Sequence, residues 1–239
     1  MPSSKDHVAV IGGTSGIGLS LARATHTLGC KVSITGRGVE RVTEIAQSIG
    51  PHVIGHHLDL ENAASIRAAL ADGPAIDHLV LMPLYSLAVS VKDFKVAEAN
   101  RLLHTKLTGY IETVSVVLPR LKPTSSIVLF SGLAKLRPYP NSTMISVANA
   151  GIIGMMNTMV VELAPIRVNA VSPGVVADSP KWDDIVRKGG NPFIEALTTR
   201  TPTRRLATMN DVIQAVFFLL DNQSVNGIDV PIDGGIRLV

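Results

Sequence analysis

The stretch that decides the fold is Gly12-Gly13-Thr14-Ser15-Gly16-Ile17-Gly18. The apolar run His7–Ile11 leads into it, and a helical pattern from Leu19 to Leu28 follows it. A strand, a glycine-rich turn and a helix in this order are typical of a dinucleotide-binding loop. Glycine lets the backbone turn tightly and approach a pyrophosphate, while the first N–H groups of the helix face the phosphates. The competing interpretation is a glycine-rich turn that binds no ligand.

Strand and helix patterns alternate along the rest of the chain without a long linker. Further strands are expected at 31–35, 52–58, 76–82, 126–130, 166–170 and 228–232, and helices at 39–49, 62–71, 97–118, 142–163 and 210–220. Apolar strands that alternate with helices predict a parallel sheet covered on both faces. We therefore expect one α/β domain over residues 1–239, a Rossmann-like doubly wound sheet that binds ligands beyond the carboxyl ends of its strands.

Composition narrows the class of protein. The chain is 46% hydrophobic and 17% charged, and its net charge of +3 comes from scattered residues, which argues against a nucleic-acid or membrane partner. The single Cys30 excludes an internal disulfide and suits a reducing compartment. We find no signal-peptide pattern and no apolar run of bilayer length, and expect a cytoplasmic protein. His52, His56 and His57 crowd one strand on alternating faces, so no metal site is predicted.

Five motifs together resemble the compact short-chain dehydrogenases/reductases. They are the Gly12 to Gly18 loop, Asp59-Leu60, Val168-Asn169, Ser172-Pro173-Gly174 and Asp233-Gly234-Gly235. The resemblance covers about Val8 to Gly235. It implies seven strands in the order 3-2-1-4-5-6-7, a bound NAD(P), a small-molecule substrate, and assembly through the two long helices as a homodimer or homotetramer.

The resemblance also implies which residues hold the cofactor. They are Gly12, Thr14, Ser15, Gly16, Ile17, Gly18, Arg37, Asp59, Leu60, Pro173, Gly174, Val176 and Asp178. An acidic residue after the second strand would hold the ribose hydroxyls of NAD, but this chain has Gly36-Arg37 there. A guanidinium can pair with a 2′-phosphate, so NADP(H) is the predicted cofactor. Alternatively, Arg37 is an ordinary exposed residue at a helix start.

The chain differs from the family at the positions of the family's catalytic residues. The family uses Asn, Ser, Tyr and Lys, with Tyr as the acid or base. Lys106 stands at the Asn position, Gly132 at the Ser position, Ile145 at the Tyr position and Asn149 at the Lys position. A shift of one residue along the last helix gives Met144 and Ala148, which restores neither group. The segment Leu81-Met82-Pro83-Leu84 also replaces the usual Asn-Asn-Ala-Gly.

Three functions are compatible with a chain that keeps the cofactor-binding residues of the family but not its catalytic residues. The first is reduction of a substrate that is already electrophilic, an iminium or an activated C=C. The second is a non-redox cyclisation, isomerisation or elimination in the same pocket, and the third is a nucleotide-binding pseudoenzyme. The candidate catalytic residues are Lys106, a substrate-facing cation oriented by Asn149, and Tyr85, with Tyr139, His78, His104 and Asp178 as weaker candidates. Trp182 and Phe193 lie in a predicted substrate lid at 179–203.

Overall fold

A computed structural model describes residues 1–85, 87–180, 182 and 192–239. One parallel sheet of seven strands runs through the domain in the order β3-β2-β1-β4-β5-β6-β7. Its strands are β1 His7–Ile11, β2 Lys31–Gly36, β3 Ile54–His57, β4 Ile76–Leu81, β5 Leu121–Phe130, β6 Arg167–Pro173 and β7 Asp229–Ile232. The predicted fold class and strand order are therefore confirmed.

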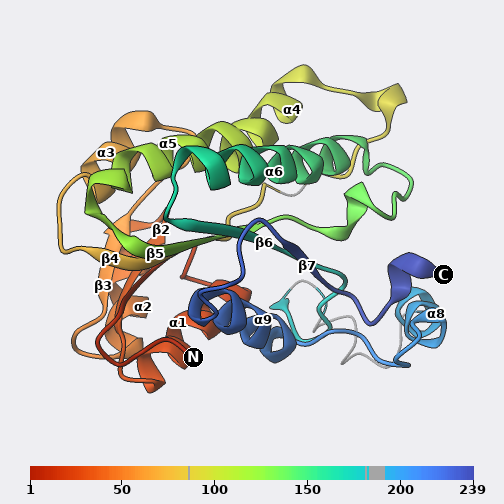
Figure 1. The fold of residues 1–239 in the computed structure, drawn as a ribbon. Helices are drawn as coiled ribbons and strands as arrows, with labels where there is room; N and C mark the ends of the chain where they lie inside the picture. Colours follow the sequence, from red (N-terminus) through yellow and green to blue (C-terminus); the bar gives the residue numbers. More distant parts are fainter. Residues whose placement is uncertain (86, 181, 183–191) are drawn as a thin grey trace.

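Helices cover both faces of the sheet (Figure 1). One layer holds α1 Gly16–Thr27, α2 Val39–Ile49 and α9 Met209–Asp221, and the other holds α3 Ala63–Leu70, α4 Val96–Leu103, α5 Gly109–Val117 and α6 Thr143–Glu162. Each layer buries its own apolar cluster against the sheet, with Val8, Val10 and Val80 in one and Ala9, Ile11 and Leu79 in the other. Successive residues of a strand therefore point to opposite faces of the sheet, and both faces are buried. This explains the near-continuous apolar runs in the sequence.

The long helix predicted at 97–118 is interrupted. The structure divides it into α4, a π-helical turn at His104–Thr108, and α5. A π-turn inserts an extra residue into the helical hydrogen-bond ladder and is frequent at functional sites. Here it carries Lys106, one of the candidate catalytic residues.

Two further differences from the sequence predictions concern helices. A helix, α8 Pro192–Arg200, forms within the predicted substrate lid at 179–203, where the sequence analysis expected no helix. The expectation that no apolar run reaches bilayer length is also wrong for α6, which spans 20 residues and contains an 18-residue window of mean hydropathy 1.6. Only 28% of its apolar window is buried inside this chain, although α6 packs on the sheet as part of one helical layer (Figure 1). Length and composition alone do not separate a membrane span from a core helix.

Candidate active site

The predicted dinucleotide loop joins β1 to α1 with the geometry that such a site requires. Gly12 has φ +87°, and a Cβ on Gly18 would lie 2.2 Å from the Gly12 carbonyl oxygen, so neither position accepts a side chain. Ser15 precedes α1 without a side-chain hydrogen bond to the helix, and the first turn contains no acidic residue. The first N–H groups of α1 are therefore available to an anion at the positive end of the helix.

A cavity of about 580 Å³ opens beside this loop, at the carboxyl ends of the strands. The glycine loop, the ends of β2 and β5 and the segments after β3 and β4 contribute to its walls. The lining residues are Gly12, Thr14, Ser15, Gly16, Ile17, Gly18, Thr35, Gly36, Arg37, Leu58, Asp59, Leu60, Glu61, Met82, Pro83, Leu84, Tyr85, Thr105, Phe130, Ser179 and Pro180. This is the edge of a doubly wound sheet where a ligand is expected, and the lining includes most of the predicted cofactor residues.

Four predicted cofactor residues at the end of β6 and just after it do not line this cavity. Pro173, Gly174, Val176 and Asp178 are not among the lining residues, within the part of the chain that the structure describes. The Asp178 carboxylate accepts a hydrogen bond from the Met209 backbone N–H at 2.7 Å, at the first turn of α9. The Asp178 carboxylate therefore has a structural role, because an acidic side chain at the N-terminus of a helix such as α9 stabilises that helix. Contact of these four residues with a cofactor stays a prediction.

Arg37 follows the last residue of β2 and is exposed at the rim of the cavity. Two carboxylates also reach the cavity, and both have partners. The Asp59 carboxylate accepts from the Glu61 backbone N–H at 3.0 Å, and Glu61 accepts from the Arg101 Nε at 2.9 Å. Among the described residues, none forms a hydrogen bond or ion pair with the Arg37 guanidinium, so its donors are available.

Tyr85 lines the cavity and takes part in a chain of polar contacts. Its hydroxyl donates to Glu98 on α4, and the Arg101 guanidinium lies 4.6 Å from the centre of its ring. Arg101 in turn pairs with Glu61 across the cavity rim. The hydrogen bond to Glu98 raises the pKa of the Tyr85 phenol. A phenol held by a carboxylate is a poor proton donor near neutral pH, so this geometry suits Tyr85 as a wall better than as an acid.

Lys106 is buried, with 2% of its surface exposed, on the π-turn between α4 and α5. Its Nζ donates to the Ser131 carbonyl oxygen at 3.2 Å, just beyond the end of β5. Burial and, to a smaller extent, the charge on Lys135 lower the pKa of Lys106 to about 7. Lys106 is therefore not a solvated helix residue. Its amine is buried, and it exchanges a proton near neutral pH.

Lys135 is a second buried lysine that the sequence analysis missed. It lies on the short helix Leu133–Lys135, and its Nζ donates to the Gly132 carbonyl at 3.2 Å and to the Ser172 hydroxyl at 2.5 Å. Its ammonium also pairs with Asp229 on β7 at 2.9 Å. Asp229 is remote in sequence, and no short motif joins it to Lys135, so only the folded sheet reveals the pair.

Asn149 fills the space that a side chain at position 132 would occupy. A Cβ added to Gly132 would lie 2.8 Å from the Asn149 Nδ2 atom. Asn149 is 3% exposed, and its Oδ1 atom is buried without a hydrogen-bond partner. Ser131 points away from the cavity, since its hydroxyl donates to the Asn149 backbone carbonyl at 2.9 Å. Lys106, Gly132 and Asn149 thus meet at one place, which we call the replaced corner.

Ile145 lies one helical turn before Asn149 on α6, on the same side of the helix. It packs in an apolar cluster with Leu87, Leu102 and Ala148. Asn149 faces Gly132, and the register that pairs Ile145 with the Tyr position and Asn149 with the Lys position stays a prediction. This side of the replaced corner presents hydrocarbon, and its equivalence with the family's acidic hydroxyl stays a prediction.

The weaker candidates lie apart from the replaced corner. The proposed acid–base role of His78 is wrong, because its ring is buried between Ser126 and Asp6 near the amino ends of the strands. His104 is exposed on the π-turn, and Tyr139 is 54% exposed before α6. Among the residues that the structure describes, neither side chain has a hydrogen-bond partner that supports a catalytic role.

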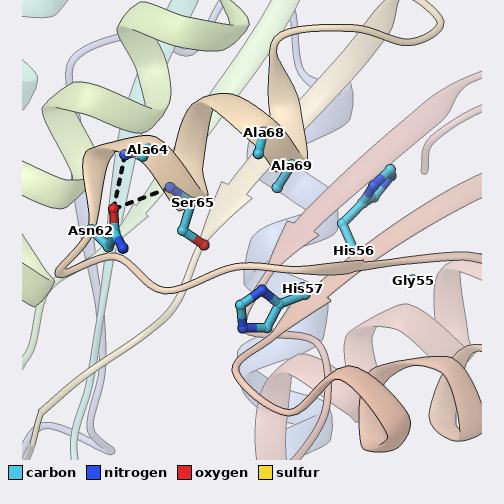
Figure 2. A pocket seen from close by; sticks show the side chains of 8 residues that line it. All are labelled: Gly55, His56, His57, Asn62, Ala64, Ser65, Ala68 and Ala69. Atoms are coloured by element: carbon cyan, nitrogen blue, oxygen red, sulfur yellow. Dashed lines mark hydrogen bonds between the residues drawn. The ribbon is translucent and has the colours of Figure 1, made fainter.

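The histidines of β3 border a separate pocket of about 510 Å³ between β3 and α3 (Figure 2). The rings of His56 and His57 are directed away from each other, and Asn62 uses its side-chain oxygen to cap α3 (Figure 2). In the described residues no group of three or more His, Cys, Asp or Glu side chains is arranged to hold a metal ion.

Part of the predicted lid lies outside the described residues, namely 181 and 183–191. Of the described part, Ser179 and Pro180 line the cavity. The rings of Trp182 and Phe193 stack with their centres 6.1 Å apart. The stacking agrees with an apolar covering segment, and its role as a lid stays a prediction.

The fold and the glycine loop beside the cavity define an α/β protein of the dinucleotide-binding class. A family model described as enoyl-(acyl carrier protein) reductase matches residues 11–237. 2-(S)-hydroxypropyl-CoM dehydrogenase 3 of Xanthobacter autotrophicus is 27% identical over 97% of this chain and 96% of its own. From the same organism, inactive 2-(S)-hydroxypropyl-CoM dehydrogenase 2 is 26% identical over 92% of this chain and 100% of its own.

A solved structure described as a short chain dehydrogenase/reductase family protein superimposes with a TM-score of 0.85. It is 29% identical, and the match covers 98% of each chain. The chain belongs to the short-chain dehydrogenase/reductase family. Family membership accounts for the cofactor cavity, but the replaced corner has to be interpreted from its own residues.

Proposed function

We propose that the protein is an NADP(H)-dependent reductase of a substrate that is already electrophilic, an iminium or an activated C=C. The observation that carries this proposal is the replaced corner. Hydride transfer to a ketone leaves an alkoxide that needs a proton donor and hydrogen-bond donors. Ile145 and Gly132 provide neither, and Ile145 belongs to an apolar cluster. A substrate whose carbon accepts hydride without such help fits this corner better than a ketone.

The preference for NADP(H) rests on the rim of the cavity. The glycine loop fits a dinucleotide, since its backbone lies too close for side chains at Gly12 and Gly18. Arg37 stands after β2 with its donors available, and the nearby Glu61 is held by Arg101. A planar guanidinium binds a phosphate with two parallel hydrogen bonds, which favours the 2′-phosphate of NADP(H). When bound, NADPH supplies a hydride, and this chain's residues hold it and shield it from water.

Purified protein mixed with NADPH and a panel of ketones, imines and α,β-unsaturated carbonyl compounds tests the proposal. We expect NADPH absorbance to fall with imines or activated alkenes and to stay constant with simple ketones. The triple variant Gly132→Ser, Ile145→Tyr, Asn149→Lys restores the family's groups at three positions. Gain of ketone reduction by this variant supports the assignment of the corner, whereas efficient ketone reduction by the unmodified protein contradicts it.

A nucleotide-binding protein without redox turnover is the second candidate. The specific support is a full-length relative whose printed name calls it inactive. Tight NADPH binding measured by calorimetry, with no NADPH consumption over the whole panel, would favour this candidate. An enzyme that catalyses a non-redox reaction in the same cavity also binds NADPH without consuming it. Mass spectrometry of the substrate distinguishes the two candidates, because only the non-redox enzyme changes the substrate.

We also propose that the protein assembles through α5 and α6 as a homodimer or homotetramer. Much of the apolar surface of α6 is exposed in the single chain, with Val147 at 49% and Val161 at 77%, and Ile111 on α5 is 48% exposed. Apolar side chains gathered on adjacent helices favour burial against another protein surface. Light scattering coupled to gel filtration measures the mass, and Val161→Glu is expected to dissociate the assembly.

A further inference from the structure

The cavity beside the glycine loop carries charges of both signs. Among its described lining residues, Arg37 is the only one with a positive charge, and Asp59 and Glu61 carry carboxylates. A free carboxylate near a 2′-phosphate opposes the binding of NADP(H), whereas the same carboxylate can accept hydrogen bonds from the ribose hydroxyls of NAD(H). The partners of these carboxylates therefore affect the choice between the two cofactors.

Arg37 and Glu61 follow neighbouring strands. β2 and β3 pair in parallel as far as Gly36 and His57, and the Leu58 backbone N–H donates to the Gly36 carbonyl oxygen at 2.9 Å. Arg37 is the next residue after Gly36, and Glu61 comes three residues after Leu58. A phosphate bound by Arg37 therefore lies on the same side of the cavity as Glu61, where the two negative charges interact.

Arg101 offsets the charge of Glu61 from outside the cavity. It lies in the last turn of α4, and its Nε atom donates to both carboxylate oxygens of Glu61, at 2.9 and 3.1 Å. Arg101 itself is not among the described lining residues. The ion pair therefore holds the Glu61 carboxylate and occupies its oxygens, although Arg101 contributes no wall of the cavity.

Two further residues hold Arg101 in this position, although 44% of its side chain is exposed. The guanidinium carbon lies 4.6 Å from the centre of the Tyr85 ring, a cation–π contact. The Tyr85 hydroxyl donates to Glu98, which precedes Arg101 by three residues and so lies on the same side of α4. Arg101 is thus fixed by an aromatic face and a carboxylate, both of which favour a cation.

We propose that Arg101 is a positioning residue that strengthens the preference for NADP(H) over NAD(H), and that it acts through Glu61. The proposal rests on the proposed function, since it assigns part of the cofactor preference stated there to a residue remote in sequence from Arg37. With Arg101 present, the charge of Glu61 is offset and its oxygens are occupied. Without Arg101, Glu61 repels the 2′-phosphate and is free to accept hydrogen bonds from ribose hydroxyls.

Calorimetric titration with NADP⁺ and with NAD⁺ measures this effect without turnover, because the two molecules differ only in the 2′-phosphate. We expect the wild type to bind NADP⁺ more tightly than NAD⁺. In Arg101→Met, the affinity for NADP⁺ is expected to fall about tenfold and the affinity for NAD⁺ to stay within about twofold, because the unpaired carboxylate opposes only the added phosphate.

Two variants test whether Arg101 acts through Glu61. In Glu61→Gln the carboxylate charge is absent, so adding Arg101→Met to this variant is expected to change the NADP⁺ affinity less than about twofold. A tenfold loss in this background as well would mean that Arg101 binds the phosphate directly, which overturns the proposal. Arg101→Lys keeps a cation that can pair with Glu61, and it is expected to retain the NADP⁺ affinity within about threefold.

Arg67→Met is the matched control. Arg67 on α3 pairs with Glu112 on α5 at 2.6 Å, and neither residue is among the described lining residues of the cavity. This variant removes the same charge from another exposed ion pair, so an effect of net charge or of folding would appear in it as well. We expect its ratio of NADP⁺ to NAD⁺ affinity to equal that of the wild type.

The outcomes separate this proposal from the proposed function. If the wild type prefers NADP⁺ and Arg101→Met leaves the ratio of the two affinities unchanged, the role of Arg101 is wrong and the preference for NADP(H) stands. If the wild type binds NAD⁺ at least as tightly as NADP⁺, or binds neither, both are wrong. If Arg101→Met lowers the ratio but no imine or activated alkene oxidises NADPH, the redox proposal is wrong and the role of Arg101 stands.

Discussion

Replacing Lys106 with methionine is expected to stabilise the folded protein near neutral pH. The substitution keeps the length of the side chain and removes the buried amine. The pKa of Lys106 falls from 10.5 to about 7 in the folded chain, chiefly because burial disfavours the charged form. Between these two values the unfolded chain holds a proton that the folded chain does not, so the free energy of unfolding rises with pH over this window.

The magnitude follows from the pKa difference. Each pKa unit corresponds to about 1.4 kcal/mol, so the shift lowers the free energy of unfolding by about 4 kcal/mol near pH 7. The methionine variant also loses the hydrogen bond from Nζ to the Ser131 carbonyl, which contributes about 1 kcal/mol. The expected net gain is therefore about 3 kcal/mol near pH 7, and it shrinks toward zero as the pH approaches 10.5.

Urea unfolding of the wild type and of Lys106→Met at several pH values measures this gain. Lys135→Met is the matched control, because it leaves the partly buried Asp229 carboxylate without its cation and is expected to lower the free energy of unfolding by about 1–3 kcal/mol. The two substitutions are thus expected to change the free energy of unfolding in opposite directions, although the two lysines lie at one corner. A loss of stability in Lys106→Met near pH 7, with no change in its pH dependence, would refute the reasoning.

Three other substitutions test the site and its frame. Gly132→Ser is expected to lower the free energy of unfolding by about 1–3 kcal/mol, because its Cβ meets the Asn149 amide. Adding Asn149→Ala should recover much of that loss in a double-mutant cycle measured by urea unfolding, and purely additive effects would contradict the contact. Arg37→Glu should lower kcat/KM for NADPH about 10- to 100-fold relative to NADH, while the same change at the neighbouring exposed Arg41 should not. Thr208→Ala removes one half of the capping box of α9 and should lower the melting temperature by about 2–4 °C, with no change in NADPH affinity.

Much of the fold followed from local patterns. The apolar strands and the helices between them predicted the sheet, because strands buried on both faces have few polar residues. The π-turn at His104–Thr108 did not follow, since its backbone hydrogen bonds depend on packing rather than on residue type. The helix α8 was likewise hidden in a stretch rich in turn residues. Tertiary contacts decide such short elements.

The cofactor loop was predictable because its residues are consecutive, and glycine is required wherever a Cβ would strike the backbone. The replaced corner was predictable only in part. The sequence identified Lys106, Gly132, Ile145 and Asn149 as unusual residues at four separate positions. Their meeting point, and the partner set of Lys135, depend on how α6, β5 and β7 pack together.

The sequence by itself determined the doubly wound sheet and the dinucleotide loop and predicted the loss of the acidic hydroxyl, because each of these depends on residue type at short spacing. The tertiary structure alone decided that Lys106 is buried beside Ser131 and that the Asn149 amide occupies the space above Gly132. Burial sets the protonation of an amine and the cost of an unpaired oxygen, and burial is a property of the packed chain.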